Sequence, residues 1–313
     1  MPPKFSRDAV AHLLMLCVVL LWGTTFVLVK AALATIPPQW FNALRMMLAF
    51  VCLAVLYRRQ WFGLTRTAWL IGAVAGFCLA IGYLFQTQGL VYTTPTNSAF
   101  ITALVVVLVP CLMSFPILRP PGASRPAWIA WAGALTAFLG VALLTAPSHA
   151  PWRQMLSTMN RGDLLTLACA LGFSMHVLTL AHGARRVPFE QIALLQIAFA
   201  MIFLTIGAFL TEPPTRLGFA AHAGRLLTPL VLSAVLITGV LATAAAFSIQ
   251  TWAQQVIPAT NIAVILTLEP VFAWITAFVF LHARMALRPS LGALLVLVAI
   301  VATELVPRWR REN

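Results

Sequence analysis

Carboxylates are scarce in this chain, which has 7 Asp and Glu residues among 313, against 20 Lys and Arg. Charged residues of both signs make up only 9% of the sequence. So few acids provide no acid-rich face for a metal ion, and we expect neither a metal site nor a cofactor. Hydrophobic residues make up 61% of the sequence, which is more apolar surface than a soluble domain can bury. The composition therefore indicates an integral membrane protein.

Catalytic and nucleotide-binding motifs are also missing. The sequence has no HExxH, no GxSxG and no Walker motif, so we expect no catalytic residue and no enzyme, and no ATP-driven pump. The Lys and Arg residues are scattered between apolar runs, which is typical of membrane-protein loops and argues against a nucleic-acid partner. No CxxC pair occurs, so we interpret the cysteines as small packing residues: Cys17, Cys52, Cys78, Cys111 and Cys169.

Ten apolar runs of about 16 to 25 residues are each long enough to cross a hydrocarbon core as a helix. The sequence therefore predicts an all-α protein with ten transmembrane helices. The runs are Leu13–Leu33, Trp40–Tyr57, Trp69–Leu90, Ala99–Leu118, Trp128–Thr145, Leu164–Ala184, Gln191–Leu210, Leu226–Gln250, Ile262–Leu281 and Leu291–Val306. We number these spans one to ten.

The basic residues predict the orientation of the spans. With the N-terminus inside, twelve Lys and Arg residues fall in inner loops and tails and six in outer loops. Since inner loops carry the excess of positive charge, we expect a multi-pass protein of the inner (plasma) membrane with both termini cytoplasmic.

The chain also contains a duplication. At one constant offset, seven residues of the first half recur in the second: Gln86, Thr87, Thr96, Asn97, Ala99, Ile101 and Leu104 match Gln250, Thr251, Thr260, Asn261, Ala263, Ile265 and Leu268. We predict a first repeat at 1–146, a linker at 147–161 and a second repeat at 162–313. Because each repeat has five spans, an odd number, the second is expected to be inverted relative to the first.

The chain resembles the EamA-type transporters of the drug/metabolite transporter superfamily over nearly its whole length. The resemblance rests on Trp22-Gly23-Thr24-Thr25-Phe26 with Lys30, Arg45, the NSAFITAL stretch from Asn97, Gly162-Asp163-Leu164-Leu165, Glu269-Pro270 and Gly292-Ala293-Leu294-Leu295. The sequence departs from the family pattern at His282-Ala283, where a Gly-Glu pair is common.

This resemblance implies a secondary transporter that exports small organic metabolites, such as amino acids, by alternating access. Its partners would be the small-molecule substrate and the lipid bilayer, with the proton as a candidate coupling ion, and it would act as a monomer or a homodimer. The alternatives are a channel and a non-transporting membrane scaffold, and least of all a membrane-embedded enzyme.

The leading candidate site residue is Glu269, which lies near the middle of span nine. An unpaired charge at that depth costs about 2.5–3.5 kcal/mol on insertion scales, so it must face a cavity, have a partner or carry a proton. It is either a substrate or proton site or a protonated carboxyl bonded to a neighbouring helix. Pro270, which has no backbone donor, favours a locally opened helix beside it.

Two basic residues, Arg45 and Lys30, lie within spans near the predicted outer surface. Either their side chains snorkel to that surface, the commoner arrangement, or they form a cationic site for a substrate carboxylate. His176 lies deep in span six and is either a hydrogen-bonded core histidine or part of a proton relay with Glu269.

Amides and aromatic residues complete the candidates. Gln86, Gln250 and Asn97 either line a site or hold helices together, while Thr96 and Thr260 are predicted helix N-caps. Trp22 and Tyr83 either contact a substrate or pack between helices. Small-residue faces at Gly72 and Gly76 in span three, and at Gly133, Ala137 and Gly140 in span five, predict close helix contacts or a dimer interface.

Overall fold

The computed structural model describes residues 6–145, 160–212, 224, 228–281 and 287–312, which form helices and connections without any strand. Short 3₁₀ helices, η1 (Arg58–Trp61) and η2 (Pro116–Leu118), lie in two of the connections. The remaining elements are α1 (Arg7–Ala32), α2 (Pro38–Leu56), α3 (Arg66–Tyr92), α4 (Pro95–Thr102), α5 (Val105–Met113), α6 (Trp128–Thr145), α8 (Arg161–Gly183), α9 (Phe189–Thr211), α11 (Pro229–Leu236), η3 (Ile237–Ala245), α12 (Ala246–Ala253), α13 (Ala259–Leu266), α14 (Leu268–Leu281) and α15 (Leu287–Glu312).

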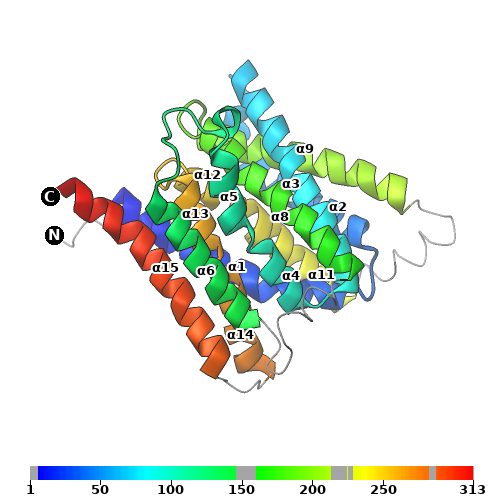
Figure 1. Ribbon diagram of the computed structural model, residues 1–313. Coiled ribbons are helices and arrows are strands. Elements are labelled where there is room, and N and C mark those ends of the chain that lie inside the picture. The colour runs from blue at the N-terminus through cyan, green and yellow to red at the C-terminus, as the bar shows by residue number, and fades with distance from the viewer. Residues whose placement is uncertain (1–5, 146–159, 213–223, 225–227, 282–286, 313) are drawn as a thin grey trace, which may run out of the picture.

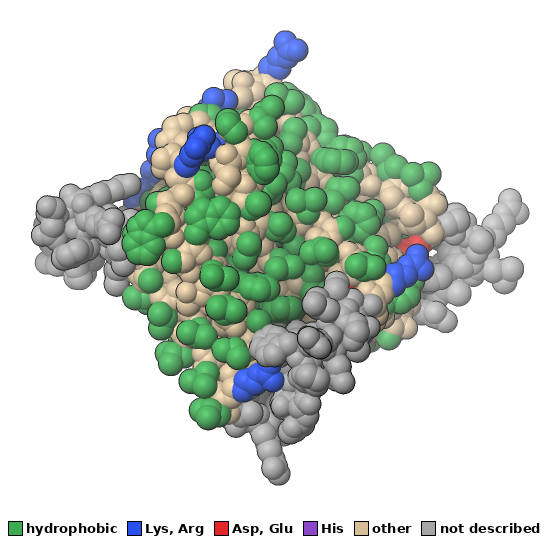
Figure 2. Space-filling model, in the orientation of Figure 1, with side chains coloured by type: hydrophobic (Ala, Val, Ile, Leu, Met, Phe, Trp, Pro, Cys, Tyr) green, Lys and Arg blue, Asp and Glu red, His purple; other side chains and the backbone are tan. Residues whose placement is uncertain are grey.

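The prediction of an all-helical protein with ten spans is confirmed. In the described part of the chain, seven helical stretches are long and apolar enough to cross a membrane, and three shorter apolar helices lie within Asn97–Met113, Trp128–Leu143 and Ser290–Thr303. Hydrophobic side chains cover most of the face in Figure 2, with Lys and Arg near its edges, as expected of a surface in contact with lipid. Most of the predicted linker, residues 147–159, lies outside the described residues, as do His282 and Ala283.

Helices from the two halves of the chain pack against each other. The helix α3 lies along α8 and α9, and α2 also lies along α9. The eighth span, which consists of α11, η3 and α12, packs on α1 and α2. On the other side of the molecule α15 runs beside α6 (Figure 1). The interior is therefore built by both halves together.

The predicted small-residue faces make close helix contacts within the chain. A Cβ atom added at Gly76 in α3 would lie 2.6 Å from the backbone oxygen of Gln196 in α9. One added at Gly140 in α6 would lie 2.8 Å from the backbone oxygen of Gly292 in α15. These positions therefore serve packing between helices of the same chain.

Acidic side chains fix two helix ends. Asp163 forms a capping box with Asn160 at the start of α8 and accepts a hydrogen bond of 2.6 Å from the Thr93 hydroxyl after α3. Glu212, after α9, accepts hydrogen bonds from the backbone N–H groups of Gln39 and Trp40 at the start of α2. Carboxylates at helix N-termini pair with donors that the helix leaves unbonded.

The eighth span has an unusual backbone, because its middle part, η3, is a π-helix. Such wider turns are rare and commonly occur at functional sites. Backbone and side-chain groups of this segment bond to α1 and α2: Trp22 donates to the Ala242 carbonyl, and Arg45 donates to the Thr243 hydroxyl. The segment thus connects the span to two candidate site residues.

We predict that Gly76→Ala destabilises the protein, because the new methyl group would overlap the α9 backbone. Overpacking of this kind costs about 1–3 kcal/mol. The measurement is the temperature at which the detergent-solubilised protein loses its monodisperse peak in size-exclusion chromatography. Gly207→Ala is the matched control, since the nearest atom to its added Cβ would be Leu84 Cδ1 at 3.5 Å. Equal midpoints for the two variants would contradict the predicted contact.

Candidate functional site

Two interrupted helices meet at the candidate site. Span four is divided between α4 and α5 at Ala103 and Leu104, and span nine between α13 and α14 at Thr267. In each interruption a backbone N–H bonds three residues back, Leu104 to Ile101 and Thr267 to Val264, both at 3.1 Å. Leu104 and the first residue of α14, Leu268, are equivalent positions in the duplicated motif. The two repeats are thus interrupted at matching places, as in many transporters with broken helices.

Proline chemistry explains the break in the second repeat. Pro270 is the third residue of α14 and has no N–H to donate to the Leu266 carbonyl one turn earlier. A proline is tolerated in the first turn of a helix, where that donor would be unbonded anyway. The expected local opening beside Glu269 is therefore present.

A cavity of about 70 Å³ lies at these interruptions. This volume accommodates water but is far below the roughly 300 Å³ of pockets that hold drug-sized ligands, so in this conformation it suits only a small solute. The cavity is lined by Trp22, Thr25, Phe26, Val29, Arg45, Tyr83, Gln86, Thr87, Leu90, Ala99, Thr102, Ala103, Val105, Phe173, His176, Val177, Phe247, Gln250, Leu266, Glu269 and Pro270.

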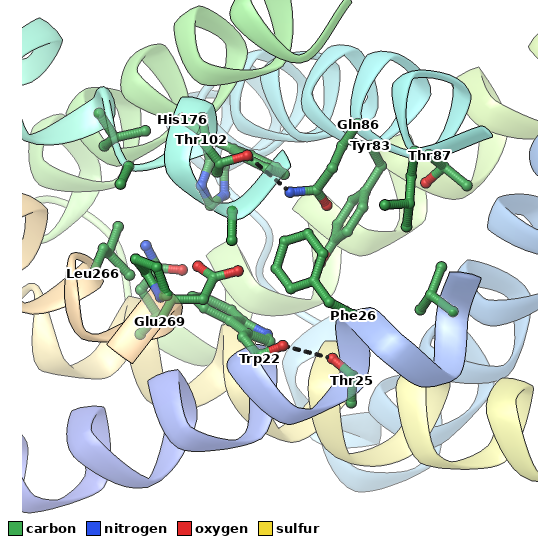
Figure 3. A pocket seen from close by; sticks show the side chains of 18 of the residues that line it. Trp22, Thr25, Phe26, Tyr83, Gln86, Thr87, Thr102, His176, Leu266 and Glu269 are labelled. Carbon is green, nitrogen blue, oxygen red and sulfur yellow. Dashed lines mark hydrogen bonds between the residues drawn. The ribbon is translucent and has the colours of Figure 1, made fainter. Parts of the chain in front are cut away.

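Glu269 is the only carboxylate that lines this cavity among the described residues. Figure 3 shows its carboxylate pointing into the space that Trp22 and His176 also border. Its side chain makes no hydrogen bond or ion pair with the described residues, although it is surrounded by protein and only partly accessible. The sequence left two interpretations open, a substrate or proton site and a carboxyl bonded to a neighbouring helix. No described residue bonds to the Glu269 side chain, so the structure favours the first.

Arg45 takes the less common of the two arrangements that the sequence left open. Its side chain does not snorkel to the surface, since only 4% of the residue is exposed. It points inward, where Nη2 donates to the Tyr83 hydroxyl at 3.2 Å and to Thr243 Oγ1 at 3.0 Å, and its guanidinium carbon lies 4.2 Å from the centre of the Tyr83 ring. These partners are neutral, and no described carboxylate pairs with Arg45. A cation in low-dielectric surroundings and stabilised only by dipoles and a π face attracts an anion strongly.

His176 is held by a buried chain of hydrogen bonds. The amide nitrogen of Gln196 donates to Thr251 Oγ1 at 2.9 Å, which leaves the Gln196 oxygen to accept from His176 Nε2 at 2.7 Å. Nε2 therefore carries the proton, and Nδ1 is the acceptor nitrogen of the ring. His176 is thus hydrogen-bonded, as the simpler prediction expected, and it also lines the cavity that holds Glu269.

The duplicated glutamines both reach the cavity. Gln86 Nε2 donates to Thr102 Oγ1 at 3.4 Å, and both side chains are drawn in Figure 3. Gln250 is only 2% exposed, and its Oε1 has no hydrogen-bond partner among the described residues. A buried amide oxygen without a donor costs about 1–3 kcal/mol, which a bound donor group would relieve.

Aromatic rings form the remaining wall. The Trp22 ring centre lies 5.2 Å from that of Phe247, and its Nε1 donates to the Ala242 carbonyl at 2.8 Å. Tyr83 packs edge-to-face with Phe173 and with Phe247. Rings fixed in this way present an apolar surface of defined shape to a solute.

Two predicted site residues lie outside the cavity. Lys30 donates to the backbone oxygens of Leu90, Val91 and Thr93, which closes the C-terminal end of α3. Asn97 is exposed in the first turn of α4. The structure thus brings together seven of the nine predicted residues: Glu269, Gln250, Gln86, Trp22, Tyr83, His176 and Arg45.

The predicted N-caps also need correction. The residue that caps α4 is Thr94, whose Oγ1 accepts from the backbone N–H of Asn97, so Thr96 lies inside the helix. Thr260 lies inside α13, whose N-cap is Pro258. In both cases a proline at or next to the cap fixes the start of the helix before the predicted position.

Sequence reasoning missed several polar residues of the site region, among them Thr102, Thr243 and Gln196. Thr102 lies within the stretch that carries the resemblance, and that position was the available signal. Thr243 and Gln196 lie in apolar spans without any pattern that marks them. Among the described residues no group of three or more His, Cys, Asp or Glu side chains is arranged to hold a metal ion.

Comparison with known proteins gives the family. The model of the EamA-like transporter family matches residues 9–146 and 160–304. An uncharacterized transporter of Archaeoglobus fulgidus is 33% identical over 289 residues, which cover 92% of this chain and 83% of the relative. The uncharacterized transporter YvbV of Bacillus subtilis is 24% identical over 297 residues, which cover 92% and 89%. A crystal structure with 20% sequence identity superposes over 98% of this chain with a TM-score of 0.76 and shows the same fold. With two family matches that span nearly its whole length, the chain belongs to the EamA-like transporter family.

Proposed function

We propose that this protein is a secondary transporter that carries a small zwitterionic metabolite, such as an amino acid, out of the cell. The observation that carries the proposal is the pair of unneutralised charges that line one cavity. Glu269 and Arg45 both border it, and neither has a charged partner among the described residues. A solute with an ammonium and a carboxylate group would neutralise both.

The other lining groups support this class of solute. The free Gln250 oxygen would accept a hydrogen bond from the ammonium group. Arg45 Nη1 makes no hydrogen bond with the described residues and would donate to the carboxylate. Aromatic rings, with Trp22 and Phe247 in contact, would pack against an apolar side chain of the solute.

Helix contacts support an inverted-repeat transporter with alternating access. In the predicted pairing, spans one and six are equivalent, as are spans three and eight. The contact between α3 and α8 then has its counterpart in the contact between α1 and the eighth span. Spans two and seven, which form α2 and α9, contact each other, and so do spans five and ten, which form α6 and α15. Such a molecule alternates by rocking one set of helices against the other around a central site.

Glu269 is also our candidate for proton coupling. A carboxyl group without a fixed partner binds a proton or a substrate cation, and competition between the two would couple their movements. A channel would need a continuous polar path through the spans, whereas the polar lining here is concentrated at the two helix interruptions.

We expect Glu269→Gln to lower transport by about tenfold or more, because a hydrogen bond to a charged group contributes about 1.5–3 kcal/mol. Flux of the substrate by proteoliposomes, measured at two external pH values, tests this. The variant should also lose the pH dependence of the wild type, while Glu269→Asp should retain part of both. Unchanged flux and pH dependence in Glu269→Gln would remove the residue from the mechanism.

Gln250→Ala should weaken substrate affinity more than Asn97→Ala does, since only Gln250 lines the cavity. The measurement is the substrate concentration at half-maximal flux, and the expected change for Gln250→Ala is about three- to tenfold. Equal effects of the two substitutions would mean that the Gln250 amide only holds helices together.

The inner-membrane topology predicts how single cysteines react. Cysteines introduced at Ser6 and at Asn313 should react with a membrane-impermeant maleimide only after the cells are permeabilised. A cysteine at the exposed Ala34, in the connection between α1 and α2, should react in intact cells. The labelling of the parent chain is subtracted in each case. Opposite accessibility of the two termini would contradict the proposed topology.

A further inference from the structure

A second, larger cavity lies at the end of the molecule where α1 begins. Its volume is about 620 Å³, and it is bordered by the connections after α5, α8 and α12. These three connections lie together at the upper left of Figure 1. Arg7 at the start of α1 donates to Gln255 Oε1 at 2.9 Å, and Gln255 belongs to the cavity wall. We call this cavity the N-terminal cleft.

The N-terminal cleft is strongly basic. Arg125, Arg185 and Arg186 line it, and all three are exposed. None of them forms an ion pair with a described residue, and no Asp or Glu is among the described lining residues. A concave site lined by charge of one sign raises the local concentration of counter-ions and their association rates by about 10- to 1,000-fold.

The walls of this cleft and of the central cavity are connected through Gln254. Gln254 lines the cleft, and its Nε2 donates to the Val177 carbonyl at 2.9 Å, while Val177 lines the central cavity. Gln250, which lines the central cavity, precedes Gln254 by one helical turn on α12. The two sets of lining residues are therefore one helical turn apart at this point.

Gln254 also has an unused acceptor. The residue is only 6% exposed, and its Oε1 has no hydrogen-bond partner among the described residues. The same cleft therefore combines exposed cationic donors with a buried acceptor. A solute that carries an anionic group at one end and an N–H or O–H donor at the other matches both.

We propose that the N-terminal cleft is a second binding site, which captures small organic solutes through a carboxylate or phosphate group before they pass Gln254 into the central cavity. Capture in the cleft does not depend on the proposed function, whereas passage into the central cavity rests on it. The arginines provide attraction and the Gln254 oxygen accepts from the donor group of the solute.

Charge-selective labelling of one cysteine tests the capture site without a known substrate. Ser124 is exposed and lines the cleft, so Ser124→Cys places a thiol there with little change of volume. Its modification rates are measured with a sulfonate-bearing and with a trimethylammonium-bearing methanethiosulfonate, after subtraction of the parent chain. Thr67→Cys is the matched control, because it is exposed and next to Arg66 but outside the cleft.

We expect the ratio of anionic to cationic modification rates to be about tenfold higher at Ser124→Cys than at Thr67→Cys. Adding Arg185→Gln and Arg186→Gln should lower the ratio at Ser124→Cys, whereas Arg58→Gln with Arg59→Gln, also an exposed pair, should leave it unchanged. Glutamate or inorganic phosphate should slow the labelling of Ser124→Cys more than chloride does at equal ionic strength.

Three results would overturn the proposal. One is an equal rate ratio at the two thiols, and another is equal protection by chloride and glutamate. The third is that the Ser124→Cys thiol is protected from labelling only in vesicles that contain phosphatidylglycerol, and not in phosphatidylcholine vesicles. That result would assign the cleft to a lipid headgroup. Labelling of the thiol does not require transport, so it is also measured in the Glu269→Gln variant. If that variant does not transport but glutamate still protects its Ser124→Cys thiol, the cleft binds anions independently of the proposed transport function.

Discussion

The structure depends on one constraint, which is that a carboxylate stands in the middle of a membrane-spanning helix without a fixed partner. Glu269 would be costly in lipid, by about 2.5–3.5 kcal/mol on insertion scales. The molecule relieves this cost by opening the helix at Thr267 and by placing the carboxylate at the edge of an internal cavity. The interruption of span four at the equivalent position supplies the opposite part of the wall. The broken helices and the cavity thus give the carboxylate a place away from lipid.

Other polar groups of the interior surround that cavity and are held in place by neutral partners. Arg45 is stabilised by Tyr83 and Thr243 rather than by an acid, and His176 by Gln196. Neutral partners of this kind hold a side chain in place without neutralising its charge. The hydrogen bonds thus fix the positions of these side chains and leave the charge of Arg45 unneutralised, as a site for a charged solute requires.

Much of the fold could be predicted from the sequence, because span length and basic loops are properties of the linear chain. The depth of a residue also follows from its place in a span, and on that ground Glu269 and His176 were identified. The side of the helix on which a residue lies cannot be predicted from the sequence in the same way, because lipid-facing and buried positions are both apolar in such a chain. For that reason a surface arrangement and a cationic site were both open for Arg45 and Lys30. Arg45 lies inside and lines the cavity, whereas Lys30 and the predicted site residue Asn97 lie outside it. The duplicated motif was the better guide, since it marked Gln86 and Gln250.

Counterflow in wild-type proteoliposomes tests the central claim most directly, namely that the two unpaired charges of the cavity select a zwitterion. The vesicles are loaded with a mixture of unlabelled amino acids, and labelled amino acids are supplied outside one at a time. Our account predicts that at least one accumulates above the level of protein-free vesicles, and that its N-acetyl derivative and its amide, each of which lacks one charge, do not compete. No accumulation of any of them, or equal competition by both derivatives, would contradict it.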